Sequence, residues 1–264
     1  MGVIYMSKND MLFVEERRNN ILNIVQRDRR ATISELSEYF QTGEATIRRD
    51  LNAMEKKGLI QRTHGGAIAK DKKNVELGME ERAEKNKLEK ERIAKAVSAL
   101  IHDGEVVMID SGSTTQKIAE YLKSKNSLIV ITNSNSIANE LVGTNDNTVM
   151  LTGGELRPRT GALVGPVANQ MIEKFRADRV ILGMSSMDID DGFFTVDPNE
   201  AELKYKMMHM SSRVIVAMDS SKVGTKSLSL VCHCHEIDIL VTDAGINKKA
   251  LSSLKKQGVE VIIV

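Results

Sequence analysis

The stretch Thr46-Ile47-Arg48-Arg49-Asp50-Leu51, inside the longer run 44–57, decides the fold of the N-terminal part of the chain. Ile47, Leu51 and Met54 are spaced i, i+4 and i+7, so they share one face of a predicted helix. The roughly opposite face carries Ala45, Arg49, Asn52 and Lys56, with Arg48 beside them. One face can therefore pack on a small core while the other offers cations and an amide to a partner.

Such a face suits a helix in the major groove of DNA, because arginine and asparagine read base edges or bind phosphate. A solvated surface helix has the same pattern, so the neighbouring segments have to separate the two interpretations. Thr32-Ile33-Ser34-Glu35 predicts a capping box that opens a short helix, and Gln41-Thr42-Gly43 predicts a three-residue turn. A short helix, a tight turn and a cationic amphipathic helix predict a helix-turn-helix.

The segment after this helix predicts a wing. Gly58 ends the helix, and residues 59–67 (LIQRTHGGA) predict two short strands around a Gly-Gly hairpin. A wing would lay Arg62 and His64 against the phosphate backbone, although His64 is equally well explained as an ordinary turn residue. The residues predicted to bind DNA are Thr46, Arg48, Arg49, Asn52, Lys56, Arg62 and His64.

The length and charge of the chain predict two domains. A chain of 264 residues exceeds the usual single domain. Residues 1–73 hold 14 Lys and Arg against 10 Asp and Glu, whereas the remainder holds 23 against 26. We expect a winged helix-turn-helix domain at 14–70, a charged linker at 71–87 and a larger domain at 88–264. Only 3% of the residues are aromatic, which argues against stacking on single-stranded nucleic acid.

Two features of the sequence bear on its compartment and on metals. No apolar run approaches the roughly 18–20 residues of a membrane span, and two cysteines predict no disulfide framework, so we expect a cytoplasmic protein. The run Val231-Cys232-His233-Cys234-His235 would place its cysteines on one side of a strand and its histidines on the other. The four side chains then cannot converge on one ion, so no metal or cofactor is expected.

From residue 88 onward the pattern is that of an α/β domain. Short β-rich runs, mostly separated by helical stretches, occur at 106–109, 128–131, 149–151, 179–182, 214–218, 237–241 and 259–264. This alternation predicts a largely parallel sheet, in which ligands bind at the carboxyl ends of the strands.

Three of these strand exits are rich in hydroxyl groups or glycine. They carry Asp110, Ser111, Gly112, Ser113, Thr114 and Thr115; Thr132, Asn133 and Ser134; and Gly153 and Gly154. Hydroxyls and the N–H groups at a helix N-terminus donate to anions, although such turns also occur as plain helix caps. Together they predict a site for a phosphorylated polyol, with sugar hydroxyls on Asp110 and Asn133.

The sequence resembles the bacterial DeoR family of transcriptional repressors. The resemblance rests on the spacing from Arg18 and Ile21 to TIRRDL, on HGGA, and on DSGSTT, TNS, LTGG, LVG, ILG, DSSK and VTD. One departure is Gly43, where the family commonly has Ser as the helix N-cap. The resemblance implies a C-terminal sensor domain similar to ribose-5-phosphate isomerase, with the effector's phosphate at 111–115 and Lys222 close by. Glu200 would correspond to a Glu found in both sensors and isomerases.

An isomerase-like enzyme with a vestigial DNA-binding module is the alternative. Isomerisation needs a carboxylate base, and the isomerases carry acids in a stretch where this chain has Gly183-Met184-Ser185-Ser186. We therefore expect no enzyme but a repressor of a carbohydrate-utilisation operon, released from its operator by a phosphorylated sugar. An activator of similar architecture remains open. Because one short helix makes few DNA contacts, we expect a homodimer or homotetramer.

Overall fold

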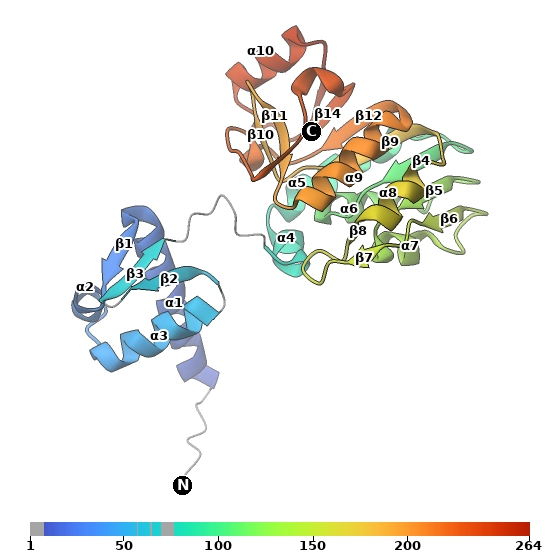
Figure 1. Cartoon of the computed structure of the whole chain (residues 1–264). Helices are drawn as coiled ribbons and strands as arrows, with labels where there is room; N and C mark the ends of the chain where they lie inside the picture. Colours follow the sequence, from blue (N-terminus) through green and yellow to red (C-terminus); the bar gives the residue numbers. More distant parts are fainter. Residues whose placement is uncertain (1–7, 57, 64, 70–76) are drawn as a thin grey trace. The chain divides into compact units, whose positions relative to one another are not determined.

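The computed structural model describes residues 8–56, 58–63, 65–69 and 77–264 (Figure 1). The chain divides into two compact units, Met1–Val75 and Glu76–Val264, and each is described by itself. The charged range 71–87, predicted as a linker, contains helix α4 (Met79–Glu84), and this helix contacts α6 (Ser113–Leu122) of the second unit.

The first unit is a small helical domain with a three-stranded antiparallel sheet. Its elements are α1 (Lys8–Asp28), β1 (Arg30–Thr32), α2 (Ile33–Tyr39), α3 (Glu44–Lys56), β2 (Ile60–Thr63) and β3 (Gly66–Ala69), and the strand order is β1-β3-β2. Ile47, Leu51 and Met54 of α3 are buried in its core, as their spacing predicted. The predicted capping box is present, with the Glu35 N–H donating to Thr32 Oγ1 at 3.2 Å. The helix-turn-helix and its wing are confirmed.

Strand β1 was not expected from the sequence, since Arg30 belongs to the basic cluster 27–30 that was predicted to end the first helix. The chain turns at Arg29, whose φ is +67°, and Ala31 pairs with Ala67 of β3. A Cβ on Gly66 would lie 2.1 Å from the carbonyl oxygen of Ala31, so only glycine allows the two strands to approach this closely. The first helix also begins at Lys8, within the segment in which the sequence showed little pattern.

Asp50 lies at the centre of the deciding stretch and is buried, with 2% of its surface exposed. Its carboxylate accepts from Arg17 Nε at 2.6 Å and from Arg18 Nε at 2.8 Å. Two arginines of α1 therefore hold α3 in place through one carboxylate. Since a buried charge is tolerated only when it is paired, this contact belongs to the fold rather than to the exposed face of α3.

The second unit is built on a seven-stranded, fully parallel sheet. In spatial order its strands are β15 (Glu260–Ile263), β14 (Ile239–Thr242), β12 (Ser211–Ala217), β9 (Ala177–Gly183), β4 (Val106–Ile109), β5 (Ile129–Thr132) and β6 (Thr148–Leu151). Each of the seven predicted runs overlaps one of these strands. The predicted α/β fold with a largely parallel sheet is confirmed.

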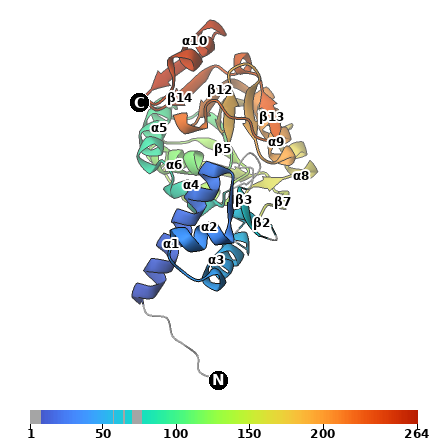
Figure 2. The ribbon, with the colours of Figure 1, turned by 90° about the vertical axis from the view of Figure 1, so that its left-hand side faces the viewer.

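Helices cover both faces of this sheet and form two cores. One face carries α5 (Lys87–Ala99), α6 (Ser113–Leu122) and α7 (Asn135–Leu141), which bury Ile93, Ile118 and Ile137. The other face carries α8 (Pro166–Ile172), α9 (Pro198–His209) and α10 (Lys248–Lys256). In Figure 2, α5 and α6 lie on one side of the sheet and α8 and α9 on the other.

Two small antiparallel elements at the strand ends were not predicted. One is the hairpin of β7 (Glu155–Leu156) and β8 (Leu163–Val164). The other is a sheet of β10 (Ser186–Asp188), β11 (Gly192–Thr195) and β13 (Ser229–Cys232). Both are built from segments of two to four residues, which are too short to show a periodic pattern.

The described residues contain no group of three or more His, Cys, Asp or Glu side chains that could hold a metal ion. Cys232 and Cys234 are both buried, and burial raises the pKa of the Cys234 thiol to about 11. Of the helices in the described part of the chain, none combines the length and the apolar character needed to cross a membrane.

Candidate functional site

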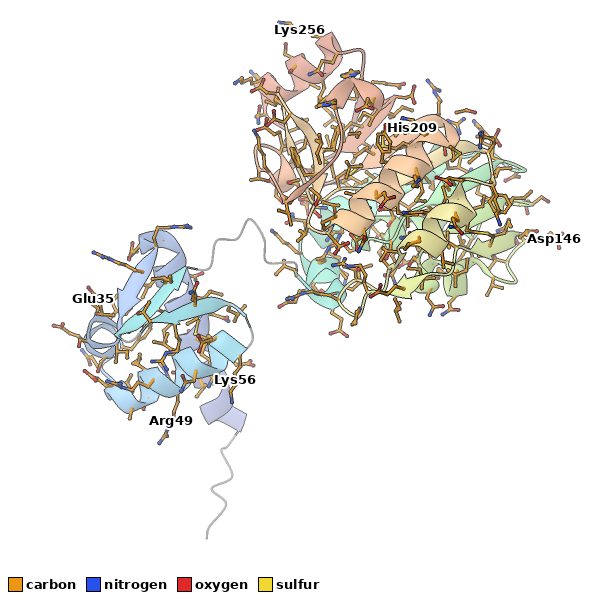
Figure 3. The ribbon with its side chains drawn as sticks, viewed as in Figure 1. Glu35, Arg49, Lys56, Asp146, His209 and Lys256 are labelled. Carbon is orange, nitrogen blue, oxygen red and sulfur yellow. The ribbon has the colours of Figure 1, made fainter. Side chains whose placement is uncertain are left out.

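The outer face of α3 carries most of the residues predicted to bind DNA. Arg48, Arg49, Asn52 and Lys56 are exposed, and Thr46 is half-buried. Figure 3 shows the side chain of Arg49 pointing away from the rest of the first unit. The cations and the amide therefore form one accessible surface on the side of α3 opposite its buried residues.

Two contacts organise this surface. Arg48 pairs with Glu44 one turn earlier at 2.9 Å, but both side chains are about half exposed, so the pair is weak and a phosphate group can compete for the arginine. Arg62 of β2 donates a side-chain hydrogen bond to Asn52, and its backbone N–H donates to Glu55 at 3.1 Å. The wing strand is therefore attached to α3. The remaining predicted residue, His64, lies outside the described residues.

In the second unit the exits of β4 and β5 meet, as the parallel sheet requires. The Ser111 N–H donates to Asn133 Oδ1 at 2.9 Å, and Asn133 Nδ2 donates to the Leu163 carbonyl at 3.2 Å. Thr132 Oγ1 donates to the Ile109 carbonyl at 2.7 Å, and Ser134 caps α7 by accepting from the Ile137 N–H. The structure brings the loops 110–115 and 132–134 together. The hydrogen bonds of Thr132 and Asn133 described above are made with the protein backbone and hold these loops in place.

The loop after β4 ends at the N-terminus of α6, where Ser113, Thr114 and Thr115 are buried. Thr115 Oγ1 donates to the Gly112 carbonyl at 3.0 Å. The hydroxyl oxygen of Thr114 is buried and has no hydrogen-bond partner within the described part of the protein. The first N–H groups of a helix also lack intrahelical partners, so this end of α6 has donors to offer to an anion.

Asp110, the first residue of the loop 110–115, is held by two contacts. Its Oδ1 accepts from the Gly183 N–H at 2.9 Å, and its Oδ2 forms an ion pair with Nζ of Lys204 in α9. Lys204 is itself buried and donates to the Gly183 carbonyl at 3.0 Å. Asp110 therefore joins the exit of β4 to the exit of β9 by a hydrogen bond and to α9 by a buried ion pair.

Three cations lie close to the loop. Lys222 Nζ donates to the Met184 carbonyl at 2.9 Å and lies 3.7 Å from Asp219. Arg82 of α4 reaches Gly112, since a Cβ there would lie 3.9 Å from the guanidinium Nη2. Burial, together with Arg82 and Lys222, lowers the pKa of Lys204 to about 7. Burial also lowers the pKa of Lys222 to about 8, with Asp219 opposing and Arg82 adding to the effect. This mutual repulsion would be relieved by a bound anion.

Glu200 lies in the first turn of α9 and is buried. Its carboxylate pairs with Arg157 and accepts from Thr160 Oγ1 at 2.9 Å. Ser111 Oγ in turn donates to the Thr160 carbonyl at 3.3 Å. The segment between β7 and β8 therefore connects Glu200 with the loop 110–115, called the hydroxyl loop below. The structure thus brings Glu200 and Lys222 to the same end of the sheet as the predicted loops.

Gly153 and Gly154 have a backbone reason for being glycine. Their φ values are +69° and +115°, a region that other residues rarely adopt. A Cβ on Gly154 would also lie 2.5 Å from the Val164 carbonyl oxygen. These glycines let the chain after β6 pack against β8 and α8, and a direct role in ligand binding stays a prediction.

The residues that sequence reasoning missed are Arg82 and Lys204. Lys204 follows Glu200 by one helical turn, a spacing that predicts the same helix face. Arg82 lies in a charged run and has no distinguishing pattern. At the position where the isomerases carry acids, Ser185 Oγ lies 3.3 Å from Thr195 Oγ1 and Ser186 donates to Ser227. Neither serine can act as a carboxylate base.

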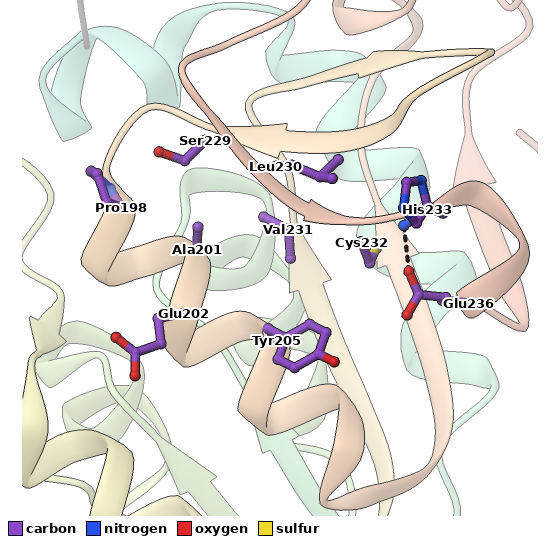
Figure 4. Close-up of a pocket in the computed structure, with 10 residues that line it drawn as sticks. All are labelled: Pro198, Ala201, Glu202, Tyr205, Ser229, Leu230, Val231, Cys232, His233 and Glu236. Atoms are coloured by element: carbon purple, nitrogen blue, oxygen red, sulfur yellow. Dashed lines mark hydrogen bonds between the residues drawn. The ribbon is translucent and has the colours of Figure 1, made fainter.

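A surface hollow of about 530 Å³ lies apart from these loops, between α9 and β13 (Figure 4). It is lined by Pro198, Ala201, Glu202, Tyr205, Ser229, Leu230, Val231, Cys232, His233 and Glu236. None of these residues belongs to the predicted effector site, so the hollow is no part of it.

Known protein families match both units. Residues 17–73 match the DeoR-like helix-turn-helix domain, and residues 85–244 match the DeoR C terminal sensor domain. The chain is 34% identical to the putative aga operon transcriptional repressor of Escherichia coli O157:H7, over 94% of this chain and 93% of that protein. It is also 34% identical to the glycerol-3-phosphate regulon repressor of Escherichia coli strain K12, over 87% of this chain and 90% of that one.

The second unit also has neighbours among solved structures. Ribose 5-phosphate isomerase from Plasmodium falciparum aligns with 53% of this chain and 53% of its own, at 16% identity and a TM-score of 0.37. A likeness of this size carries no information about activity.

Proposed function

Because this chain belongs to the DeoR family of DNA-binding transcriptional regulators, we propose that it represses a carbohydrate-utilisation operon and leaves its operator when a phosphorylated sugar binds. Two of its relatives are named as repressors, of the aga operon and of the glycerol-3-phosphate regulon. The observation that carries the effector part of this proposal is the meeting of Arg82 and Lys222 beside the hydroxyl loop 110–115, where the buried Thr114 hydroxyl has no hydrogen-bond partner among the described residues. Excess positive charge beside free hydroxyl and N–H donors is what a phosphate monoester requires.

The exposed face of α3 would hold the operator. Arg49 and Asn52, which are both exposed, would read base edges, because arginine pairs with guanine and asparagine with adenine in the major groove. Thr46, Arg48 and Lys56 would contact the duplex from the same helix, and Arg62 and His64 from the wing. Contacts of the wing with phosphate raise affinity without reading sequence.

The protein would bind DNA as a homodimer or homotetramer. One α3 helix of 13 residues makes too few contacts for a specific affinity in the nanomolar range. Two copies related by a twofold axis would bind two half-sites about one or more helical turns apart. An operator with two inverted half-sites is therefore expected.

The effector would bind at the strand exits of the second unit. Its phosphate group would accept from Ser111, Gly112, Ser113, Thr114 and Thr115, with Lys222 as a nearby cation, and its hydroxyls would lie toward Asp110, Thr132, Asn133, Ser134, Gly153, Gly154 and Glu200. The effector releases the operator only if it binds one of two protein geometries more tightly, because a ligand with equal affinity for both shifts nothing.

The test is fluorescence anisotropy with the full-length protein and a labelled DNA fragment from upstream of its own gene. Arg49→Ala should abolish specific binding, whereas Arg27→Ala, which removes another exposed cation at the end of α1, should bind within about threefold of the wild type. Addition of a phosphorylated sugar should weaken binding of the wild type. Operator affinity of Arg49→Ala equal to that of the wild type at the same salt concentration contradicts the assignment of α3.

A further inference from the structure

Lys204 is a buried cation to which the proposed function gives no role. It lies on α9, and only 5% of its surface is exposed. Its ammonium group contacts Asp110 Oδ2 and donates to the Gly183 carbonyl at 3.0 Å. An ammonium group has three N–H donors, and within the described part of the chain these two acceptors are the contacts it makes. One donor is therefore left for a bound molecule.

The ammonium group of Lys204 lies at the start of the hydroxyl loop. Asp110 immediately precedes Ser111, and Gly183, which contacts both partners of the ion pair, packs beside Thr115. A Cβ on Gly183 would lie 3.7 Å from Thr115 Cγ2 and 3.8 Å from Asp110 Oδ1. The Asp110–Lys204 pair thus lies next to the proposed phosphate site, on the side of the β9 strand exit.

The chemistry of the pair differs from that of the other cations. Asp110 and Lys204 are in direct contact, so together they carry no net charge but still present an acceptor and a donor. An alcohol both donates and accepts a hydrogen bond, and it is matched by such a neutral pair. A phosphate dianion is matched instead by N–H groups, hydroxyls and cations with charge to spare.

Glu200, on the same helix, supports the view that this part of the site binds hydroxyl groups. It precedes Lys204 by one turn, and its carboxylate is held by Arg157 and Thr160. Helix α9 therefore presents an acceptor and a donor on one face, with Lys204 against Asp110 and Glu200 against the segment between β7 and β8. Two polar groups in this arrangement suit neighbouring hydroxyls of a carbohydrate chain.

We infer that Lys204, with Asp110 as its partner, binds a hydroxyl group on the carbohydrate part of the effector and thereby determines which phosphorylated sugar the protein recognises. This inference rests on the proposed function. Lys204 and Asp110 form a donor and acceptor pair for the sugar, while the hydroxyl loop and Lys222 receive the phosphate.

The experiment is isothermal titration calorimetry on the full-length protein. The probes are inorganic phosphate, glycerol 3-phosphate, fructose 6-phosphate, glucosamine 6-phosphate and glucitol 6-phosphate. Lys204→Met should lower the affinity for the sugar phosphate that binds most tightly to the wild type by about 10- to 100-fold, which corresponds to the loss of one charge-assisted hydrogen bond. The affinity for inorganic phosphate should stay within about twofold of the wild-type value. The matched control is Lys206→Met, since Lys206 lies two residues further along α9 and pairs with Glu173 outside the site.

A second variant guards against loss of folding, because Lys204→Met leaves Asp110 buried without its cation. In Lys204→Met/Asp110→Asn both partners are neutral, and the same selective loss of sugar phosphate binding is expected. Unchanged sugar phosphate affinity in both variants overturns the inference alone, and so does an equal loss for sugar phosphates and inorganic phosphate. Wild-type protein that binds no sugar phosphate more tightly than inorganic phosphate overturns the proposed effector class as well.

Discussion

Asp50 offers the sharpest test of how the first unit is held together. In Asp50→Asn the side chain keeps its shape but loses its charge, so Arg17 and Arg18 face a neutral amide. Each charge-assisted hydrogen bond contributes about 1.5–3 kcal/mol. The two arginine side chains are 21% and 28% exposed, so water recovers part of the loss. We therefore expect a destabilisation of about 2–4 kcal/mol, less than the sum of two full bonds.

The assay is hydrogen exchange of the full-length protein, followed by mass spectrometry of its peptides. Amides of α1 and α3 should exchange about 30- to 1,000-fold faster in Asp50→Asn, while peptides of the seven-stranded sheet serve as an internal reference. Asp28→Asn is the matched control, because Asp28 forms an exposed pair with Arg27 that contributes little to stability. Exchange in α3 that accelerates by less than about threefold would refute the view that this carboxylate holds α3 to α1.

Three further outcomes are expected. Gly66→Ala should destabilise the first unit by about 1–3 kcal/mol, because its Cβ would meet the Ala31 carbonyl, whereas Gly65→Ala, with open space around it, should not; thermal unfolding separates the two. Gly43→Ser should stabilise α3 by a few tenths of a kcal/mol, since the site has room for the side chain and serine caps better; the melting temperature measures this. Lys222 and Lys204 have pKa values of about 8 and about 7, so the affinity for a sugar phosphate should fall at least about tenfold between pH 7 and pH 9 as their ammonium groups lose protons. Calorimetry at the two pH values checks this, and in Lys222→Met the decrease in affinity should shrink to the part that Lys204 contributes.

The same pKa shift has a consequence for stability. Because the pKa of Lys222 is lower in the folded protein than its ordinary value of 10.5, the unfolded chain binds more protons between about pH 8 and 10.5. This lysine therefore makes the folded state more stable as the pH rises through that window. Ligand affinity and unliganded stability should move in opposite directions there.

Local sequence patterns were sufficient to predict the helices and strands whose buried residues repeat at regular spacing. The seven strands of the parallel sheet are apolar runs because both of their faces are covered by helices. The α3 helix was predictable because Ile47, Leu51 and Met54 repeat at helical spacing, and the capping box because its two residues are three apart. The loops 110–115 and 132–134 could be placed together since parallel strands end at the same edge.

Other features depend on contacts between distant segments. Strand β1 forms because Gly66 lets the backbone of β3 approach Ala31 of β1. The three residues of β1 alone do not indicate this contact. The role of Asp50 depends on two arginines more than thirty residues away. The small sheet of β10, β11 and β13 is likewise assembled from short segments without a pattern of their own.

By itself the sequence determined the seven strands of the parallel sheet, the DNA-binding motif and the strand ends where a ligand would bind, since these follow from periodicity and from residues close together along the chain. Only the tertiary structure decided which further cations join Lys222 beside the hydroxyl loop. The family resemblance had placed Lys222 there, but Arg82 and Lys204 come from two other elements and look like ordinary charged residues in the sequence. Their common site arises because the sheet brings its strand exits to one edge, where burial strengthens the effect that each charge has on the others.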